Sequence, residues 1–384
     1  MLNSLSGLIK NVAHEEEAIF ALIKSTALPV ILWGAGEIAW CVLMYLRQHG
    51  IEPVCFCDND LSKQGMSHIG LPVYSYEGIK NKFISNGGKY QIVVATGIQY
   101  KEPIFSQLSR ACEKNPFWYL RGFEVCGEKI NYPYYLEYES QFNEAYSLLA
   151  DDFSKSVYAN VLNAKISGDF SLYSEIKSKT EYFDDDIVSL LDNEVFLDVG
   201  AFKGNAIIEF NRRTNKVYDG IIAFEPDKKT LLTLEGVISL NGIKKIELHN
   251  MGAWHKHQII HFQAGREGGS RISEIIDNSL SADSMEVDTI DNILNGRRVT
   301  YVSMDIEGAE HNAILGAEQT IKKWMPKLAV SVYHRREDLF DLLLLLRSFV
   351  PGYKFFMRHY TDNQTETVLY AIADKDAITK GKCE

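Results

Sequence analysis

The residues best suited to hold a nucleotide surround a glycine turn in the middle of the chain, FLDVGAFKG. Asp198 and Gly200 come at the carboxyl end of an expected strand, and Gly204 opens the helix that follows. Small residues let the backbone approach a ligand closely, and free N–H groups at a helix start favour a carboxylate or another anion. Glu225, in AFEPD, ends the next expected strand, where an acidic side chain can accept both hydroxyls of a ribose. The pattern fits NAD or S-adenosylmethionine, and the acidic residue before the first glycine favours S-adenosylmethionine.

Candidates for handling a methyl acceptor follow the later strands. Transfer to a hydroxyl needs an acceptor held in line with the donor sulfur and one base that takes its proton. Asp305, in DIEGAE, is the preferred base and a further cofactor contact, and His334, in VYHRRED, assists because histidine titrates near neutral pH. The carboxyl ends of parallel strands share one edge of the sheet, where open α/β sheets bind ligands. The residues expected to contact the acceptor are Glu307, Arg335, Arg358 and His359.

Several of these candidates also have a structural interpretation. Glu307 and Glu310 would be stabilised by the dipole of a helix that is expected to begin at DIEGAE and to extend to about Trp324. Arg335 could pair with the nearby Glu337 instead of binding an anion. A carboxylate cluster at this point could hold Mg²⁺, but no further oxygen ligand is identifiable. The sequence therefore predicts no metal site.

The elements that must position these residues form two alternating patterns of strands and helices. Residues 28–130, after an N-terminal helical segment at 1–27, predict a small Rossmann-like α/β domain. Residues 131–180 show only helical spacing and predict a helical connector. Residues 181–384 contain seven strand-like segments, of which the last two are joined without a helix. This last pattern predicts an α/β domain with a doubly wound, seven-stranded sheet whose final strand is antiparallel.

A series of ordered motifs in residues 155–375 resembles the FkbM family of S-adenosylmethionine-dependent methyltransferases. The motifs are EYFDDD (181–186), FLDVGAFKG, AFEPD, GGSRI (268–272), VDTIDNI (287–293), VSMDIEGAEHNAILGA (302–317), VYHRREDLF (332–340) and RHY…ETVLYA (358–371). The resemblance implies a class I methyltransferase fold and O-methylation of a hydroxyl on a sugar, a glycan or a related natural product. This turn reads GAFKG where the family more often has GANIG, but both glycines and Asp198 remain. Tyr182 and Phe183, before the first strand, could cover the cofactor or pack in the core.

A second glycine turn, PVILWGAGEIA, opens the N-terminal pattern. Gly34, Gly36 and Ala39 match G-x-G-x-x-A, and Asp58 ends the next expected strand, the place of a ribose-binding acid. Alone, this would indicate NAD, but the domain has no evident hydride-transfer partner such as a Tyr-x-x-x-Lys pair. The stretch FCDNDLSKQG…GLPVYS resembles the nucleotide-sugar-binding Rossmann-like domain of some bacterial sugar-modifying enzymes. The resemblance implies a sugar-nucleotide site, or a scaffold that has lost its ligand.

Composition narrows the function classes further. A net charge of −11 argues against a duplex nucleic-acid binder, which needs cations to displace counterions from phosphates. The N-terminus lacks the pattern of an export signal, and the most apolar window, residues 339–350, is too short to span a bilayer, so a cytoplasmic protein is expected. Two alternatives to a methyltransferase stay open: an NAD-dependent oxidoreductase using the first turn, and a non-catalytic scaffold of two Rossmann-like units. The sequence identifies neither the acceptor nor the oligomeric state, and a homo-oligomer stays open.

Overall fold

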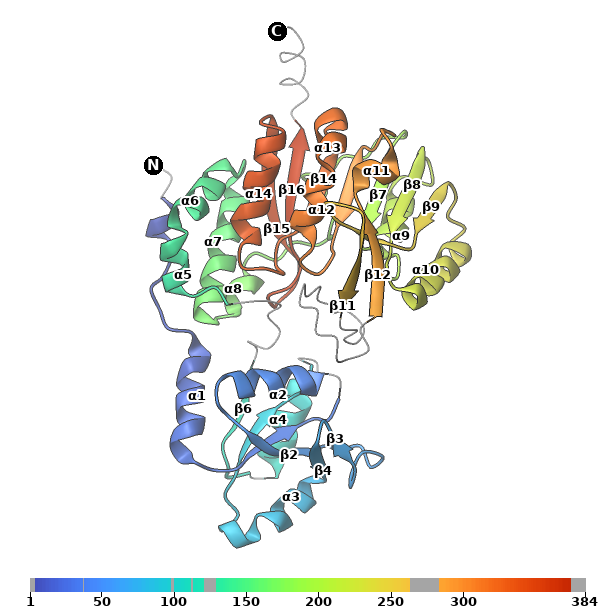
Figure 1. Ribbon diagram of the computed structural model, residues 1–384. Helices are drawn as coiled ribbons and strands as arrows, with labels where there is room; N and C mark the ends of the chain where they lie inside the picture. Colours follow the sequence, from blue (N-terminus) through green and yellow to red (C-terminus); the bar gives the residue numbers. More distant parts are fainter. Residues whose placement is uncertain are drawn as a thin grey trace. The chain divides into compact units, whose positions relative to one another are not determined.

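The computed structural model of the chain describes residues 4–36, 38–97, 100–111, 113–120, 129–262 and 283–373. They form two compact units (Figure 1). The larger unit comprises Met1–Lys10, Gly127–Lys165 and Phe170–Glu384, and the smaller unit comprises Asn11–Cys126 and Ile166–Asp169. Within these described ranges, no helix is long and apolar enough to cross a membrane. The GGSRI motif at 268–272 lies outside the described residues.

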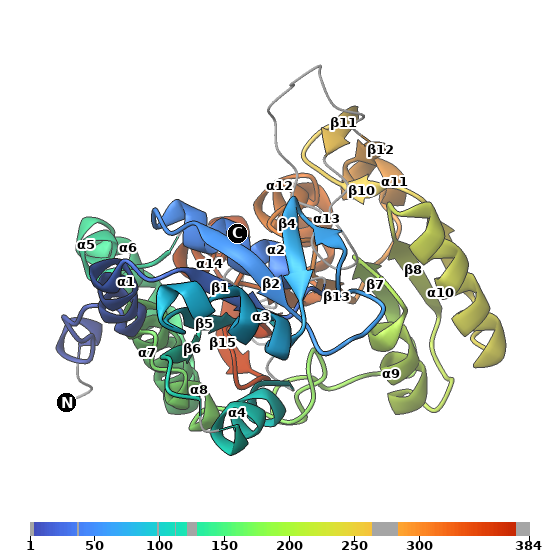
Figure 2. The same ribbon diagram turned by 90° about the horizontal axis from the view of Figure 1, so that it is seen from below.

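The smaller unit is built on a six-stranded sheet in the order β3-β4-β2-β1-β5-β6. Its strands run parallel except β3, which is antiparallel to β4, and Figure 2 shows β2 and β4 side by side. Helix α2 packs Val42, Leu43 and Leu46 against one face of the sheet. The elements are α1 (Glu15–Thr26), β1 (Val30–Trp33), α2 (Ile38–Gln48), β2 (Pro53–Cys57), β3 (Ser67–His68), β4 (Leu71–Tyr74), α3 (Tyr76–Lys82), η2 (Ile84–Asn86), β5 (Gln91–Val94), α4 (Lys101–Arg110) and β6 (Phe117–Tyr119).

The larger unit contains a seven-stranded sheet in the order β15-β16-β14-β13-β7-β8-β9. β16 is antiparallel to both of its neighbours, whereas β14, β13, β7, β8 and β9 are parallel. The seven strands are β7 (Val195–Val199), β8 (Gly220–Phe224), β9 (Ile246–His249), β13 (Tyr301–Met304), β14 (Lys327–Ser331), β15 (Tyr353–His359) and β16 (Thr367–Ala373). The predicted α/β fold, with its seventh strand antiparallel, is confirmed.

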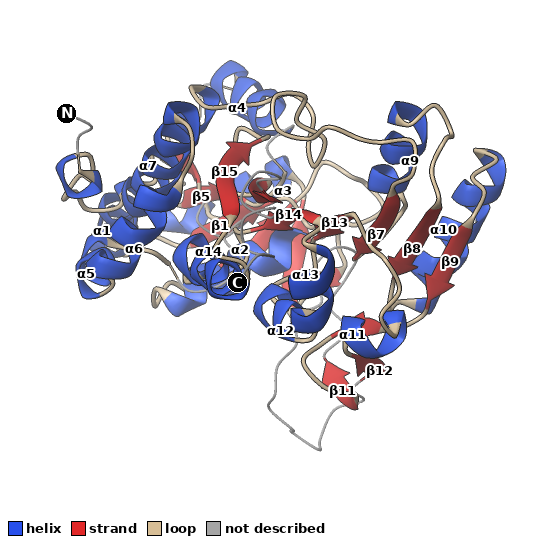
Figure 3. Cartoon of the chain, turned by 90° about the horizontal axis from the view of Figure 1, so that it is seen from above, coloured by secondary structure: helices blue, strands red, loops and turns tan. Residues whose placement is uncertain are grey.

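Helices cover both faces of this sheet (Figure 3). On one face, Ile207 and Phe210 of α9 (Asn205–Arg213) and Leu234 of α10 (Lys228–Leu240) belong to the same core cluster as Phe196, on which Phe210 stacks. Ile314 of α12 (Glu310–Leu315) and Ile321 of α13 (Glu318–Trp324) face the opposite side, where Leu197 and Val302 line a small apolar cavity with them. Successive strand residues point to opposite faces, so the central strands β7, β8, β13 and β14 are buried along most of their length, whereas the edge strand β9 is only partly buried. The remaining elements on this sheet are α11 (Ile290–Leu294) and α14 (Asp338–Phe349).

A small sheet and four short-to-medium helices complete the larger unit. The small sheet has the order β10-β12-β11, with β10 (Gly252–Ala253), β11 (Gln258–Phe262) and β12 (Asp283–Asp288). The helices of the expected connector are α5 (Tyr132–Glu137), α6 (Glu139–Leu148), α7 (Asp152–Ser167) and α8 (Ser171–Ser174), and η1 (Leu5–Gly7) packs with α6. Phe142 of α6 meets Phe340 of α14 edge to face, with ring centroids 4.9 Å apart. These helices therefore share a core with the edge of the large sheet.

The helix expected from DIEGAE to Trp324 is interrupted, and this expectation was wrong. Residues 305–309 form a turn, in which Glu307 and Gly308 have φ values of 56° and 96°, and α12 begins only at Glu310. A second break at Gly316 separates α12 from α13. A Cβ atom at Gly316 would lie 2.0 Å from the Trp254 carbonyl oxygen, so the backbone passes too close to its neighbour for any side chain.

Candidate active site

The FLDVGAFKG turn connects β7 to α9 at the carboxyl edge of the seven-stranded sheet. Gly200 has φ 90°, and a Cβ atom there would lie 2.0 Å from the Asp305 carbonyl oxygen, which follows the neighbouring strand β13. Gly204 has φ 84° and is the N-cap of α9, with no side chain capping the helix. Both positions require glycine, and together they leave backbone N–H groups at the helix start open to a ligand.

Glu225 lies at the end of β8, directly beside this turn. One carboxylate oxygen accepts the Phe202 N–H at 2.9 Å, and the other accepts the Asp227 N–H, also at 2.9 Å. Burial raises the pKa of Glu225, and the two backbone hydrogen bonds oppose that rise. Because a carboxylate oxygen has two lone pairs, each oxygen can still accept a ligand hydroxyl. The arrangement suits recognition of a diol such as a ribose.

Asp198 lies at the end of β7 and is buried. Its Oδ1 accepts a hydrogen bond of 2.6 Å from the Ser303 hydroxyl, whereas Oδ2 has no hydrogen-bond partner in the part of the chain that the structure describes. Burial raises the pKa of Asp198 to about 7, against the Ser303 hydrogen bond and with help from Asp305 and Glu225. A buried acceptor without a donor is costly, so a ligand ammonium group is a fitting partner for Oδ2.

Asp305, the residue after β13, is the centre of a cluster of polar side chains on the same edge. Its Oδ2 accepts hydrogen bonds from the Tyr182 hydroxyl at 2.8 Å and from the Tyr333 hydroxyl at 3.2 Å. Its Oδ1 lies 3.4 Å from Nε2 of His334, which follows β14. The Asp305 side chain remains 25% exposed, so a ligand can still reach it. The fold thus brings together the two residues proposed for catalysis.

His334 is enclosed by carboxylates on both sides of its ring. Nδ1 lies 3.0 Å from Oε1 of Glu310, and Nε2 lies 3.6 Å from Oε2 of Glu307. Burial works against the charged ring, but Glu310, Asp305 and Glu307 outweigh it and raise the pKa of His334 to about 10. Burial, together with Asp305 and Glu310 and against His334, raises the pKa of Glu307 to about 7. His334 and the three carboxylates form an ion network in which the imidazole is the cationic member. Contrary to the expectation from the sequence, His334 therefore does not titrate near neutral pH, because the carboxylates raise its pKa.

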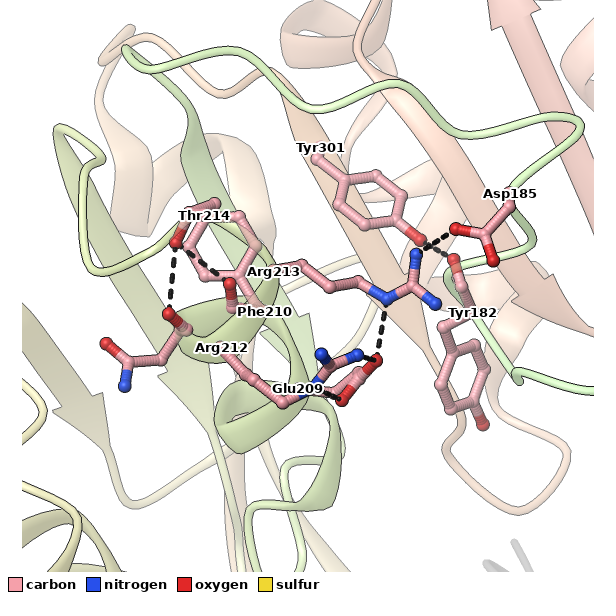
Figure 4. Close-up of polar contacts among 9 residues, drawn as sticks. Tyr182, Asp185, Glu209, Phe210, Arg212, Arg213, Thr214 and Tyr301 are labelled. Carbon is pink, nitrogen blue, oxygen red and sulfur yellow. Dashed lines mark hydrogen bonds and ion pairs between the residues drawn. The ribbon is translucent and has the colours of Figure 1, made fainter.

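The segment that carries Tyr182 is held in place from two directions (Figure 4). The Tyr301 hydroxyl donates a hydrogen bond to the Tyr182 carbonyl oxygen. Arg213 of α9 forms one ion pair with Asp185 and another with Glu209 of its own helix. Tyr182 has φ 58°, a left-handed conformation that these contacts maintain. They fix the point from which its hydroxyl reaches Asp305.

Three residues of this cluster were not among the predicted site residues. Tyr333 immediately precedes His334, and this position next to a predicted site residue could have identified it from the sequence. Glu181 and Glu366 belong to segments far apart in the sequence, and no spacing could have related them. Burial, the hydrogen bond to Glu181 and its charge raise the pKa of Glu366 to about 10. The cluster is therefore more acidic than the sequence motifs indicated.

The structure does not bring the other proposed acceptor contacts into this cluster. Arg358 is buried and forms ion pairs with Asp151 at 3.0 Å and with Asp184 at 3.6 Å. His359 is fully buried, stacks on Tyr173 with ring centroids 4.5 Å apart, and has a pKa that burial lowers to about 4. The Arg335 guanidinium is half exposed and lies 3.6 Å from the Glu337 carboxylate. This is the ion pair expected from the sequence as the alternative to anion binding.

The first glycine turn, in the smaller unit, has its own acidic partner. Gly34 has φ 112°, and the following N–H, that of Ala35, donates to Asp58 Oδ2 at 2.8 Å. Asp58 Oδ1 accepts the Asp60 N–H at 2.8 Å, and Lys63 lies 3.3 Å from Oδ2. Asp58 thus joins the turn after β1 to the end of β2, the strand end at which it was expected from the sequence.

Comparisons with known proteins bear on the larger unit and on the whole chain. Residues 198–355 match the family described as Methyltransferase FkbM domain. A crystal structure of methyltransferase FkbM from Methylobacillus flagellatus KT has a TM-score of 0.70 and 24% identity, covering 92% of this chain and 92% of that one. An rRNA methylase from Streptococcus thermophilus has a TM-score of 0.30 and 14% identity, covering 48% of this chain and 89% of that one. A protein from Streptococcus mutans, solved in complex with SAH, has a TM-score of 0.29 and 10% identity, covering 53% of this chain and 94% of that one. No curated protein sequence matches.

Proposed function

This chain belongs, through residues 198–355, to the FkbM methyltransferase family, and from that premise we propose that it is an S-adenosylmethionine-dependent O-methyltransferase. The acceptor is a hydroxyl of a sugar, a glycan or a related natural product. The observation that carries the proposal is the turn at Gly200, which has no room for a side chain and lies between Asp198, Glu225 and Asp305.

The residues at this turn fit S-adenosylmethionine in three ways. Asp198 Oδ2, buried without a hydrogen-bond donor among the described residues, suits the ammonium group of the aminoacyl end. The open N–H groups after Gly204 suit its carboxylate, and Glu225 suits the ribose diol. When bound, S-adenosylmethionine supplies a methyl group on a positively charged sulfur, whose S–C bond breaks as a C–O bond forms while sulfur keeps the electron pair.

Asp305 and His334 are proposed to act on the acceptor hydroxyl, Asp305 as the base and His334 as the cation that positions the Asp305 carboxylate. Asp305 is exposed enough to contact a ligand and would take the hydroxyl proton as the new C–O bond forms. Tyr182 and Tyr333 fix one carboxylate oxygen of Asp305, and His334 lies beside the other. Glu307, which is 33% exposed, remains a proposed acceptor contact at the mouth of the same cluster.

Calorimetry with S-adenosylhomocysteine tests the cofactor site. We expect Glu225→Ala and Gly200→Val to abolish binding, because one removes the diol acceptor and the other fills the turn. Glu247→Gln is the matched control, since Glu247 pairs with Arg297 on the surface. Undiminished affinity in both site variants would refute the assignment.

Methyl transfer itself is tested with radiolabelled S-adenosylmethionine and a panel of free sugars, nucleotide sugars and RNA. The acidic cluster and the net charge of −11 support a small-molecule or glycan acceptor over nucleic acid. Once an acceptor is found, Asp305→Ala and His334→Ala should each lower turnover at least about tenfold. Near-full turnover in both variants would place the proton acceptor elsewhere. We also propose a cytoplasmic location, which cell fractionation can check.

A second proposal concerns the smaller unit, which we infer binds a nucleotide. Asp58 accepts the N–H of Ala35, one residue after Gly34, at 2.8 Å, and Glu225 accepts the N–H of Phe202, two residues after Gly200, at 2.9 Å. Both glycine turns therefore have a strand-end carboxylate bound to their backbone. Titration with NADH, followed by fluorescence, and with a UDP-sugar, followed by calorimetry, tests the inference. Saturable binding that Gly34→Val removes would support it, and no binding of either probe would refute it.

A further inference from the structure

Asp305, Glu310 and His334 converge where β13, α12 and β14 meet at the carboxyl edge of the large sheet. One oxygen from each carboxylate and one ring nitrogen of His334 lie within 4.8 Å of one another. We propose that these three side chains form a binding site for a divalent metal ion of the Mn²⁺ type. The sequence offered DIEGAE alone as a source of ligands, and the fold adds the imidazole from the neighbouring strand.

Each of the two carboxylates is fixed through one oxygen and keeps the other available. Tyr182 donates to Asp305 Oδ2 at 2.8 Å, which leaves Oδ1 on the side of the imidazole. The Ile306 N–H donates to Glu310 Oε1 at 2.9 Å, while Glu310 Oε2 has no hydrogen-bond partner in the described ranges. Metal–ligand bonds of about 2.1 Å place octahedral ligand atoms about 3 to 4.2 Å apart. Small side-chain rotations would bring the three atoms within that range.

Burial and charge distinguish this group from an ordinary acidic surface. Glu310 is 0% exposed and His334 is 3% exposed, so two of the three ligands are withdrawn from water. Among the described residues, the ion pairs recorded for Asp305, Glu307 and Glu310 are all with His334. One imidazole cannot balance three carboxylates. A buried carboxylate oxygen that lacks a donor inside a field of negative charge is the feature that a bound cation would satisfy.

The donor set selects the class of ion. Two carboxylates favour Mg²⁺ and Mn²⁺, and an imidazole favours first-row transition metals, so the mixed set suits Mn²⁺. Binding would release the imidazole proton to solvent and leave the remaining positions to water. A hydroxyl of the acceptor could take one of them and become more acidic there. That last role rests on the proposed methyl transfer, whereas the binding of the ion does not.

The test is a Mn²⁺ titration of the full chain after treatment with a chelator, followed by the electron paramagnetic resonance signal of free Mn²⁺. We expect one site per chain, weakened at least about tenfold by Glu310→Gln and by His334→Gln. Both variants keep the size of the original side chain. Glu247→Gln, outside the cluster, is the control and should bind Mn²⁺ as the wild type does.

Calorimetry with S-adenosylhomocysteine is run on the same samples, so that loss of the fold and loss of the ion are separated. If either variant fails to bind S-adenosylhomocysteine, its melting temperature is compared with that of the wild type, and a variant that melts as the wild type does still tests the metal site. Absence of wild-type binding below about 1 mM Mn²⁺, or equal binding by all variants, would overturn the proposal. The cofactor assignment would survive that result, because S-adenosylhomocysteine affinity is measured independently of the metal.

Discussion

Replacing Gly200 by alanine should damage both the stability of the larger unit and its affinity for the cofactor. The added Cβ atom would lie 2.0 Å from the Asp305 carbonyl oxygen and 3.0 Å from the Asp305 carbonyl carbon. Separating them to an ordinary contact requires a shift of about 1 Å or more between two turns, each of which a backbone hydrogen bond ties to a neighbouring strand. Those bonds are Gly200 N–H to Phe224 O and Asp305 N–H to Val199 O, both 3.0 Å.

The magnitude follows from two contributions. Alanine at φ 90° costs about 1 to 2 kcal/mol relative to glycine, because the left-handed region is strained for a residue with a Cβ atom. Weakening the two backbone hydrogen bonds adds about 1 kcal/mol each. The expected loss is about 3 kcal/mol, which corresponds to a melting temperature lower by about 6 to 12 °C for a unit of this size.

Scanning calorimetry with and without S-adenosylhomocysteine measures both effects, since the ligand raises only the transition of the unit that binds it. Gly236→Ala is the matched control: Gly236 lies in α10 with no atom within 4 Å of an added Cβ. We expect the control to be stabilised by about 0.5 to 1 kcal/mol through helix propensity. A Gly200→Ala protein with wild-type melting and wild-type affinity would refute the argument from close approach.

Three further predictions concern separate parts of the chain. Because the pKa of Asp198 is raised to about 7, its carboxylate ionises as the pH rises through that value, and wild-type affinity for S-adenosylhomocysteine should increase from pH 5.5 to about 7.5. Asp198→Asn should bind more weakly with no such rise, and calorimetric titrations with parallel pH profiles would contradict this. Arg358→Met should destabilise the larger unit by about 3 kcal/mol in urea unfolding, because Asp151 loses its ion-pair partner, while cofactor affinity stays unchanged. Gly34→Ala, whose Cβ would lie 2.4 Å from Thr96 Cγ2, should lower only the calorimetric transition of the smaller unit, and a lowered transition of the larger unit would argue against this.

The sequence alone was sufficient for the features that depend on short stretches of chain. The alternation of apolar strands with helices predicted the seven-stranded sheet, and the absence of a helix between the last two strands predicted the antiparallel β16. The link between a glycine turn and the acid ending the next strand was also readable, because one strand, turn and helix separate Gly200 from Glu225. Such units have nearly the same geometry wherever they occur.

Only the tertiary structure decided which strand-end residues share a site. Arg358 and His359 end a strand as Asp305 does, but their strand, β15, lies at the edge of the sheet. There, Ser154 of α7 accepts a hydrogen bond from Arg358, and Asp151, the residue before α7, forms an ion pair with it. These contacts draw Arg358 into a buried ion pair. Which strand lies beside which, and which helix covers its end, depends on packing over the whole unit and not on local spacing.

The acidic cluster shows the same division between local pattern and fold. The motif DIEGAE predicted carboxylates near Asp305. It did not predict that the helix begins only at Glu310, or that His334 approaches from the end of β14. At the break, Glu307 and Gly308 have left-handed φ values, through which a right-handed helix cannot continue. By itself the sequence determined a glycine turn and the acid that ends the next strand. The packing of β14 against β13 decided that His334 lies between Asp305 and Glu310, because only that contact carries an imidazole into the carboxylates.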